Sequence, residues 1–97
     1  NGFFITKSLL AAYYQNNDLD SIERTIVPKL DIKDIDPVML GFYSYVLLTK
    51  GKDEEARKFF LKAKEKGLTR KRLSLFINYK KVLDDFVEKL KPLGSLD

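Results

Sequence analysis

Residues 36–67 read DPVMLGFYSYVLLTKGKDEEARKFFLKAKEKG, and this stretch decides the fold. Asp36 followed by Pro37 is typical of a helix start, because an aspartate can cap free backbone N–H groups and the fixed φ of proline suits the first helical turn. The apolar run that follows predicts a helix ending at Lys50 and Gly51, where glycine can adopt a positive φ.

The second half of the stretch predicts another helix. Acidic residues 53–55 would lie at its positive end and lysines toward its negative end, as the helix dipole favours. Gly67 is a suitable terminator. One face carries small and aromatic side chains at helical spacing: Ala56, Phe59, Phe60 and Ala63. Residues 36–67 are therefore predicted to form a helical hairpin.

The segment before this hairpin has the same organisation. Apolar spacing predicts a helix over residues 3–15 that stops at Asn16 and Asn17, since asparagine tolerates the left-handed turn at a helix end. Asp18 is the expected N-cap of a second helix, which should end before Pro28. Residues 29–35 are then an irregular link.

The segment after the hairpin predicts one long helix. Thr69 is a suitable N-cap, and the helix should reach about residue 91, before Pro92. Its inner face would be Leu73, Phe76, Ile77, Leu83, Phe86 and Leu90. Because no segment alternates with period two between hairpin turns, an all-α fold is predicted.

The two hairpins repeat with a period of 34 residues. At this shift the turn residues, the small positions and the aromatic positions coincide: Tyr14 with Leu48, Asn17 with Gly51, Ile22 with Ala56 and Ile26 with Phe60. Hairpins too thin to bury their own apolar faces form one core by stacking.

Residues 38–67, with Gly51, Ala56, Phe60 and Ala63 in order, resemble a tetratricopeptide repeat. Ser44 stands where that family usually has glycine. The resemblance implies an α-α superhelix of two helix-turn-helix repeats, about 3–35 and 37–67, closed by a capping helix over about 70–91. This is one domain, residues 1–97, and it could be a fragment of a longer protein.

The same resemblance implies a function in protein interaction. The first helix of each repeat would line a concave groove that binds a peptide or helix of a partner protein. Tyrosines suit such contacts because they combine a large flat face with a hydroxyl. The implied groove residues are Lys7, Tyr14, Gln15, Tyr45, Leu48, Thr49 and Tyr79.

Charge supports an alternative hypothesis, RNA binding. Residues 1–49 hold four basic and six acidic side chains, a net charge of −2, whereas residues 50–97 carry +6. The run 64–68 resembles the end of a pentatricopeptide repeat, an RNA-binding relative. An anionic partner would be drawn to the basic cluster Arg57, Lys58, Lys62, Lys64, Lys66, Arg70, Lys71 and Arg72. The alternative interpretation of this cluster is a solvated face.

Composition argues against catalysis. The chain contains no cysteine and no histidine, so thiol nucleophiles, cysteine-based metal sites and the commonest general base are missing. Carboxylates at 53–55 and at Asp84, Asp85 and Glu88 are interpreted as surface charges. We therefore expect a non-enzymatic protein with no cofactor, metal or membrane insertion, located in the cytoplasm. A homodimer that buries the apolar first helix is a further partner hypothesis.

Overall fold

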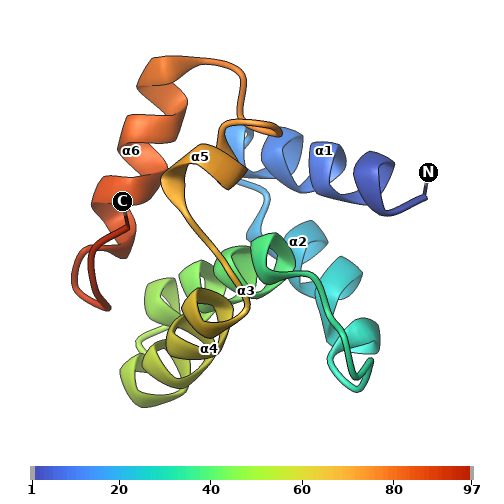
Figure 1. The fold of residues 1–97 in the computed structure, drawn as a ribbon, viewed down its shortest axis with the longest axis vertical. Coiled ribbons are helices and arrows are strands. Elements are labelled where there is room, and N and C mark those ends of the chain that lie inside the picture. Colours follow the sequence, from blue (N-terminus) through green and yellow to red (C-terminus); the bar gives the residue numbers. More distant parts are fainter. Residues whose placement is uncertain (1, 97) are drawn as a thin grey trace.

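The computed structural model describes residues 2–96, and the side chains from residue 5 onward. Across these residues the protein is all-helical, and no strand is present. Its elements (Figure 1) are α1 (Gly2–Gln15), α2 (Leu19–Ile26), the short 3-10 turn η1 (Val27–Lys29), α3 (Pro37–Thr49), α4 (Asp53–Glu65), α5 (Arg70–Leu73) and α6 (Lys80–Leu90). The predicted all-α class is confirmed.

Three helices begin at the predicted capping residues. The Asp18 carboxylate accepts a hydrogen bond from the backbone N–H of Ser21, at 3.1 Å, and Asp36 accepts one from Val38, at 2.8 Å. The Thr69 hydroxyl accepts one from Arg72, at 3.1 Å. Each bond satisfies a backbone donor that has no partner within its helix.

The turns that end α1 and α3 have the same geometry 34 residues apart. Asn17 has φ of 56° and Gly51 has φ of 80°, the left-handed conformation that closes a helix. The N–H of Asp18 bonds to the carbonyl of Tyr13 at 2.8 Å, and that of Lys52 bonds to Leu47 at 2.9 Å. The turn that ends α4 has the same geometry, with φ of 103° at Gly67 and a 2.9 Å bond from the N–H of Leu68 to the carbonyl of Ala63, so this turn type is not specific to the 34-residue shift.

The prediction of a single helix over residues 70–91 is wrong. The chain leaves helical geometry after Leu73 and resumes it only at Lys80. A straight helix over residues 70–90 would be about 31 Å long, which exceeds the 28 Å extent of the molecule. The break lets Phe76 and Ile77 enter the core and brings α6 back beside α1 and α3 (Figure 1).

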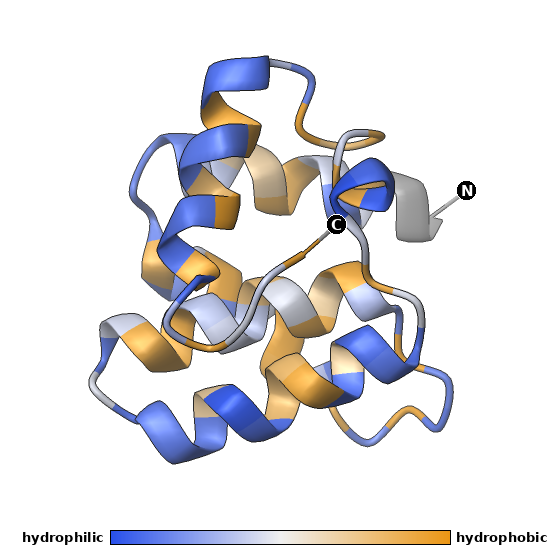
Figure 2. Cartoon of the chain, turned by 60° about the vertical axis from the view of Figure 1, so that its left-hand side comes forward, coloured by the Kyte–Doolittle hydropathy of each residue, from blue (hydrophilic) through white to orange (hydrophobic). Residues whose placement is uncertain are grey.

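Helix α3 forms the centre of the core. Its first eleven residues, 37–47, are all buried, whereas α4 and α6 alternate hydrophilic and hydrophobic residues along their ribbons (Figure 2) and bury only some of them. The Leu68 side chain packs closely against the backbone of α3 at Gly41, because glycine has no Cβ atom; a Cβ there would lie 3.0 Å from Leu68.

None of the helices in residues 2–96 combines the length and the apolar character that crossing a bilayer requires.

Candidate functional site

The tyrosines expected to line an open groove lie in the core. Tyr14 is 5% exposed and Tyr45 is 7% exposed. Phe86 of α6 covers both, with ring centroids 4.9 Å from Tyr14 and 5.6 Å from Tyr45, and it also contacts Phe42. The expectation that these two rings are open to a partner is corrected, because the break at residues 74–79 returns α6 onto them.

The other implied groove residues lie in separate places. Lys7 forms an ion pair with Asp36, at 2.7 Å, and its ammonium lies 4.5 Å from the ring centre of Phe76. Leu48 is half-buried against the core. Gln15, Thr49 and Tyr79 are exposed.

Uncovering the tyrosines would cost too much free energy. Leu83, Phe86, Val87 and Leu90 of α6 are buried. Burial of each such side chain contributes about 1.5–3 kcal/mol, so detaching α6 would cost about 6–12 kcal/mol. That range is similar to the whole stability of a small domain, about 5–15 kcal/mol. Helix α6 is therefore part of the fold, and the rings of Tyr14 and Tyr45 are not available as a binding surface.

A polar cluster joins α6 to α1 at the surface. The Tyr14 hydroxyl donates a hydrogen bond to the Asp85 carboxylate, and the Lys89 ammonium lies 3.1 Å from the same carboxylate. Burial raises the pKa of Tyr14, and the negative charge of Asp85 raises it further. The hydrogen bond from Tyr14, together with Lys89, lowers the pKa of Asp85. Both shifts favour the neutral phenol beside a charged carboxylate.

The raised pKa of Tyr14 predicts a loss of stability in alkali. A phenol in the unfolded chain ionises near pH 10, whereas Tyr14 keeps its proton in the folded state. The unfolded state then binds fewer protons, so the free energy of unfolding falls as the pH rises above about 10. Tyr14→Phe should lose less stability than the wild type between pH 8 and pH 11 in urea titrations. Equal losses in the two proteins would contradict the shift, and Tyr79→Phe, which removes an exposed phenol, should behave as the wild type.

A cavity of about 390 Å³ opens beside this cluster, between the end of α1 and the outer face of α6. Three of its side chains can donate hydrogen bonds and have no side-chain partner among the described residues: Gln15, Asn17 and Lys81. The remaining lining residues are Tyr14, Val82, Asp85 and Lys89. We call this cavity the α1–α6 pocket.

Of the residues that line this pocket, the sequence analysis predicts a binding role only for Tyr14 and Gln15. A signal for the α6 residues was present, because positions 81, 85 and 89 are four residues apart and therefore share one helical face. That spacing does not reveal which element the face would meet. The fold decides it, by turning α6 against the end of α1.

The basic cluster is spread over different sides of α4 and α5. At 100° per residue, Arg57 and Lys64 lie on one side of α4, Lys58 and Lys62 lie on another, and Glu65 lies between them. Arg57 reaches the carbonyl of Pro92, at 3.5 Å, and Lys66 reaches that of Lys33, at 3.4 Å. Lys71 and Arg72 are exposed on α5.

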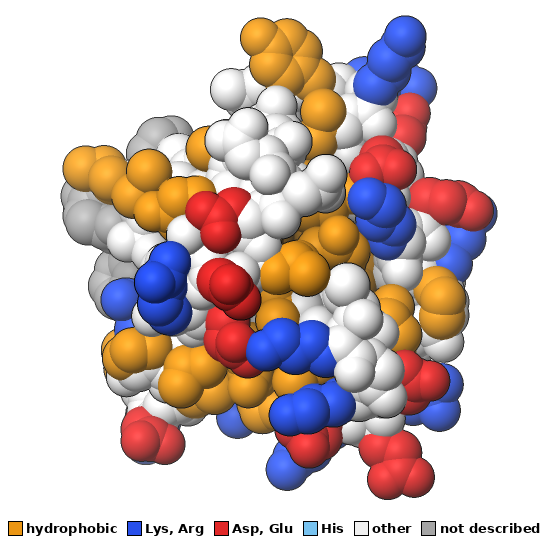
Figure 3. All heavy atoms as spheres, turned by 180° about the vertical axis from the view of Figure 1, so that it is seen from behind, with side chains coloured by type: hydrophobic (Ala, Val, Ile, Leu, Met, Phe, Trp, Pro, Cys, Tyr) orange, Lys and Arg blue, Asp and Glu red, His pale blue; other side chains and the backbone are white. Residues whose placement is uncertain are grey.

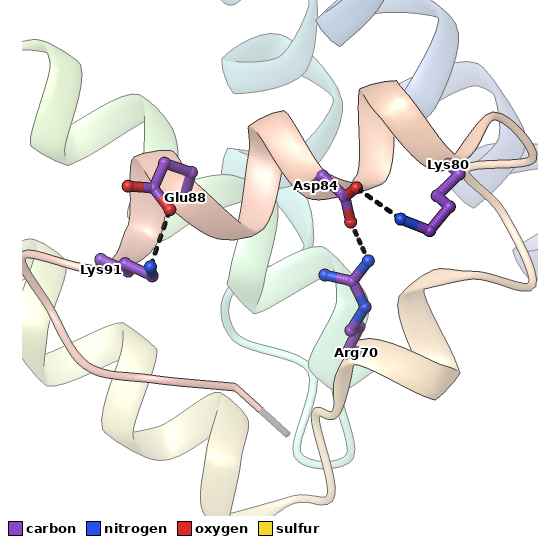
Figure 4. A network of polar contacts seen from close by, with 5 residues as sticks. All are labelled: Arg70, Lys80, Asp84, Glu88 and Lys91. Carbon is purple, nitrogen blue, oxygen red and sulfur yellow. Dashed lines mark hydrogen bonds and ion pairs between the residues drawn. The ribbon is translucent and has the colours of Figure 1, made fainter.

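One residue of the cluster also has an acidic partner. Arg70 is paired with Asp84, which also binds Lys80, at 3.1 Å (Figure 4). Seen from behind, the surface shows acidic, basic and apolar side chains interspersed (Figure 3). Within the cluster, Arg70 is paired with a carboxylate and the basic residues of α4 are divided between two sides of the helix.

The carboxylates of α6 point to separate partners. Asp84 binds Arg70 and Lys80, Asp85 binds Tyr14, and Glu88 pairs with Lys91, at 2.8 Å (Figure 4). Their positions agree with the interpretation as surface charges.

Comparisons with protein-family models, with curated proteins and with solved structures give no match to this chain.

Proposed function

We propose that the chain is a non-enzymatic protein-interaction module, similar to a tetratricopeptide repeat, which binds an acidic segment of a partner protein in the α1–α6 pocket. The observation that carries the proposal is the convergence of Gln15, Asn17 and Lys81 on one cavity without side-chain partners. Exposed donors at a concave surface can exchange their contacts with water for an external acceptor.

The chemistry of the pocket favours a carboxylate. The Lys81 ammonium is a donor only and matches a carboxylate, which offers acceptors only, and the amides of Gln15 and Asn17 each add an NH2 donor beside a carbonyl acceptor. Lys89 adds a second positive charge, although Asp85 already pairs with it. Val82 offers an apolar wall for the carbon atoms of the bound segment. An Asp- or Glu-containing peptide fits this combination better than an apolar helix does.

The 34-residue match between the two hairpins in the sequence supports the repeat part of the proposal, although α1 contacts α2 less extensively than α3 contacts α4. The same turn hydrogen bonds recur after 34 residues, and α1 and α3 both contact α2. A superhelical stack of the two units accounts for these features. In this arrangement the pocket lies where α6 leaves part of α1 uncovered.

RNA binding through residues 57–72 is the alternative function. It is less well supported, because Arg70 is neutralised by Asp84 and the lysines of α4 lie on different sides of the helix. Phosphate contacts depend on positive charges that can follow one backbone.

A peptide-binding experiment tests the proposal. Peptides selected from a displayed library would be labelled, and their dissociation constants measured by fluorescence polarisation. Lys81→Glu should weaken binding at least tenfold, because it places a carboxylate against the bound carboxylate. Lys62→Glu makes the same change of charge at an exposed position outside the pocket, and it should change the dissociation constant less than twofold.

Single-stranded RNA provides the second arm of the same experiment. If RNA binds and Lys62→Glu weakens it while Lys81→Glu has a smaller effect, the RNA function replaces the proposal. If no peptide binds, or if both variants weaken peptide binding equally, the pocket is not the binding site.

A further inference from the structure

The outer face of α1 differs chemically from the rest of the surface. Three exposed residues of α1, Ile5, Leu9 and Ala12, lie at i, i+4 and i+7 and form one stripe, which Asn16 extends just beyond the end of the helix, while exposed Gln15 lies to one side of it. Ile5 is 62% exposed and Leu9 is 45% exposed. The stripe contains no charge, although a third of the chain is charged and the exposed faces of α4 and α6 carry many charged side chains.

The equivalent stripe of α3 is covered by neighbouring helices. At the 34-residue shift, Ile5, Leu9 and Ala12 correspond to Met39, Tyr43 and Val46, which are all buried. Asn16 corresponds to Lys50, which pairs with Glu23 of α2, at 2.7 Å. The Tyr43 ring packs against Phe59 of α4, with ring centroids 5.0 Å apart, and α2 also contacts α3, so neighbouring helices cover this side of α3. No described element occupies the corresponding position on α1.

We propose that the stripe of α1 binds the same stripe of a second copy of this chain, in an antiparallel pair of helices. A two-fold axis through the midpoint of residues 5–16 places Leu9 of each copy against Ala12 of the other. A large side chain then meets a small one, which allows the helices to approach closely. This inference is independent of the proposed pocket function.

The absence of charge favours a second copy as the occupant. A two-fold axis through the midpoint of residues 5–16 brings the central positions, Leu9 and Ala12, near their own copies, so charges of one sign there would repel each other. The small area of the stripe also limits the affinity of the dimer. Helix α1 is about 21 Å long, so two such faces bury less than the roughly 1,000 Å² typical of stable interfaces. We therefore expect dissociation constants between about 50 µM and 1 mM.

Sedimentation equilibrium of the full chain from 10 µM to 1 mM tests the dimer, with these concentrations chosen to span the expected range on the order of 100 µM. The wild type should change from monomer to dimer. Leu9→Glu should raise the dissociation constant at least tenfold with little change in melting temperature, because Leu9 is already partly exposed. Leu61→Glu makes the same substitution at an exposed position of α4, and it should leave the dimer unchanged.

Salt and cross-linking identify the contact. Each copy has a net charge of +4, so raising the salt concentration should strengthen a dimer whose interface contains no ion pairs. Since the chain has no cysteine, Leu9→Cys and Ala12→Cys chains can be mixed under oxidation, and they should form the mixed disulfide faster than either variant pairs with itself. A chain that remains monomeric at 1 mM, or a dimer unaffected by Leu9→Glu, would overturn the proposal.

Discussion

Phe86→Ala should lower the free energy of unfolding by about 3–5 kcal/mol, the largest effect expected of any single substitution considered. Phe86 is fully buried and contacts three aromatic rings from α1 and α3, those of Tyr14, Phe42 and Tyr45. Alanine removes these contacts and leaves a cavity between α6 and the rest of the core. For a chain of 97 residues this loss is a large part of the total stability.

Urea denaturation followed by circular dichroism measures this loss. Tyr79→Ala is the matched control, because Tyr79 is also aromatic, lies at the start of α6 and is 68% exposed. It should change the free energy of unfolding by less than about 0.5 kcal/mol. If Phe86→Ala were as mild as this control, α6 would not be part of the core, and Tyr14 and Tyr45 would again be available to a partner.

Asp36→Ala should lower the free energy of unfolding by about 2–3 kcal/mol, because Asp36 has two roles. One carboxylate oxygen caps α3 through the N–H of Val38, and the other pairs with Lys7 at 2.7 Å. The Lys7 side chain is only 14% exposed, so it cannot turn fully to water once its partner is lost. Alanine removes the cap and leaves this ammonium without its counter-charge.

Asp36→Asn separates the two roles. Asparagine caps helices about as well as aspartate but carries no charge, so this variant should retain the cap and lose the ion pair. Its loss of stability should be about half that of Asp36→Ala, measured by the same urea titrations. Equal losses in the two variants would show that the cap contributes nothing. A loss in Asp36→Ala alone would show that the pairing with Lys7 contributes nothing.

The candidate site was less predictable than the helices. Tyr14 and Gln15 could be selected from the sequence, but the same amphipathic ring suits both a groove and a core, so the burial of Tyr14 could not be read from its type. Lys81 and Asn17 are far apart in sequence and become neighbours only through the position of α6. The basic residues between 57 and 72 are close in sequence, yet the helical twist of α4 and the pairing with Asp84 separate their charges.

The sequence by itself determined the all-helical class, the capping residues Asp18, Asp36 and Thr69, and the matching turns at Asn17 and Gly51. These features depend on hydrogen bonds and spacings within about four residues, so a local pattern is sufficient to specify them. Only the tertiary structure decided that residues 74–79 interrupt the last helix and that α6 covers the tyrosines. The contact between Tyr14 and Asp85 joins positions 71 residues apart, and its stability comes from core burial that no local pattern encodes.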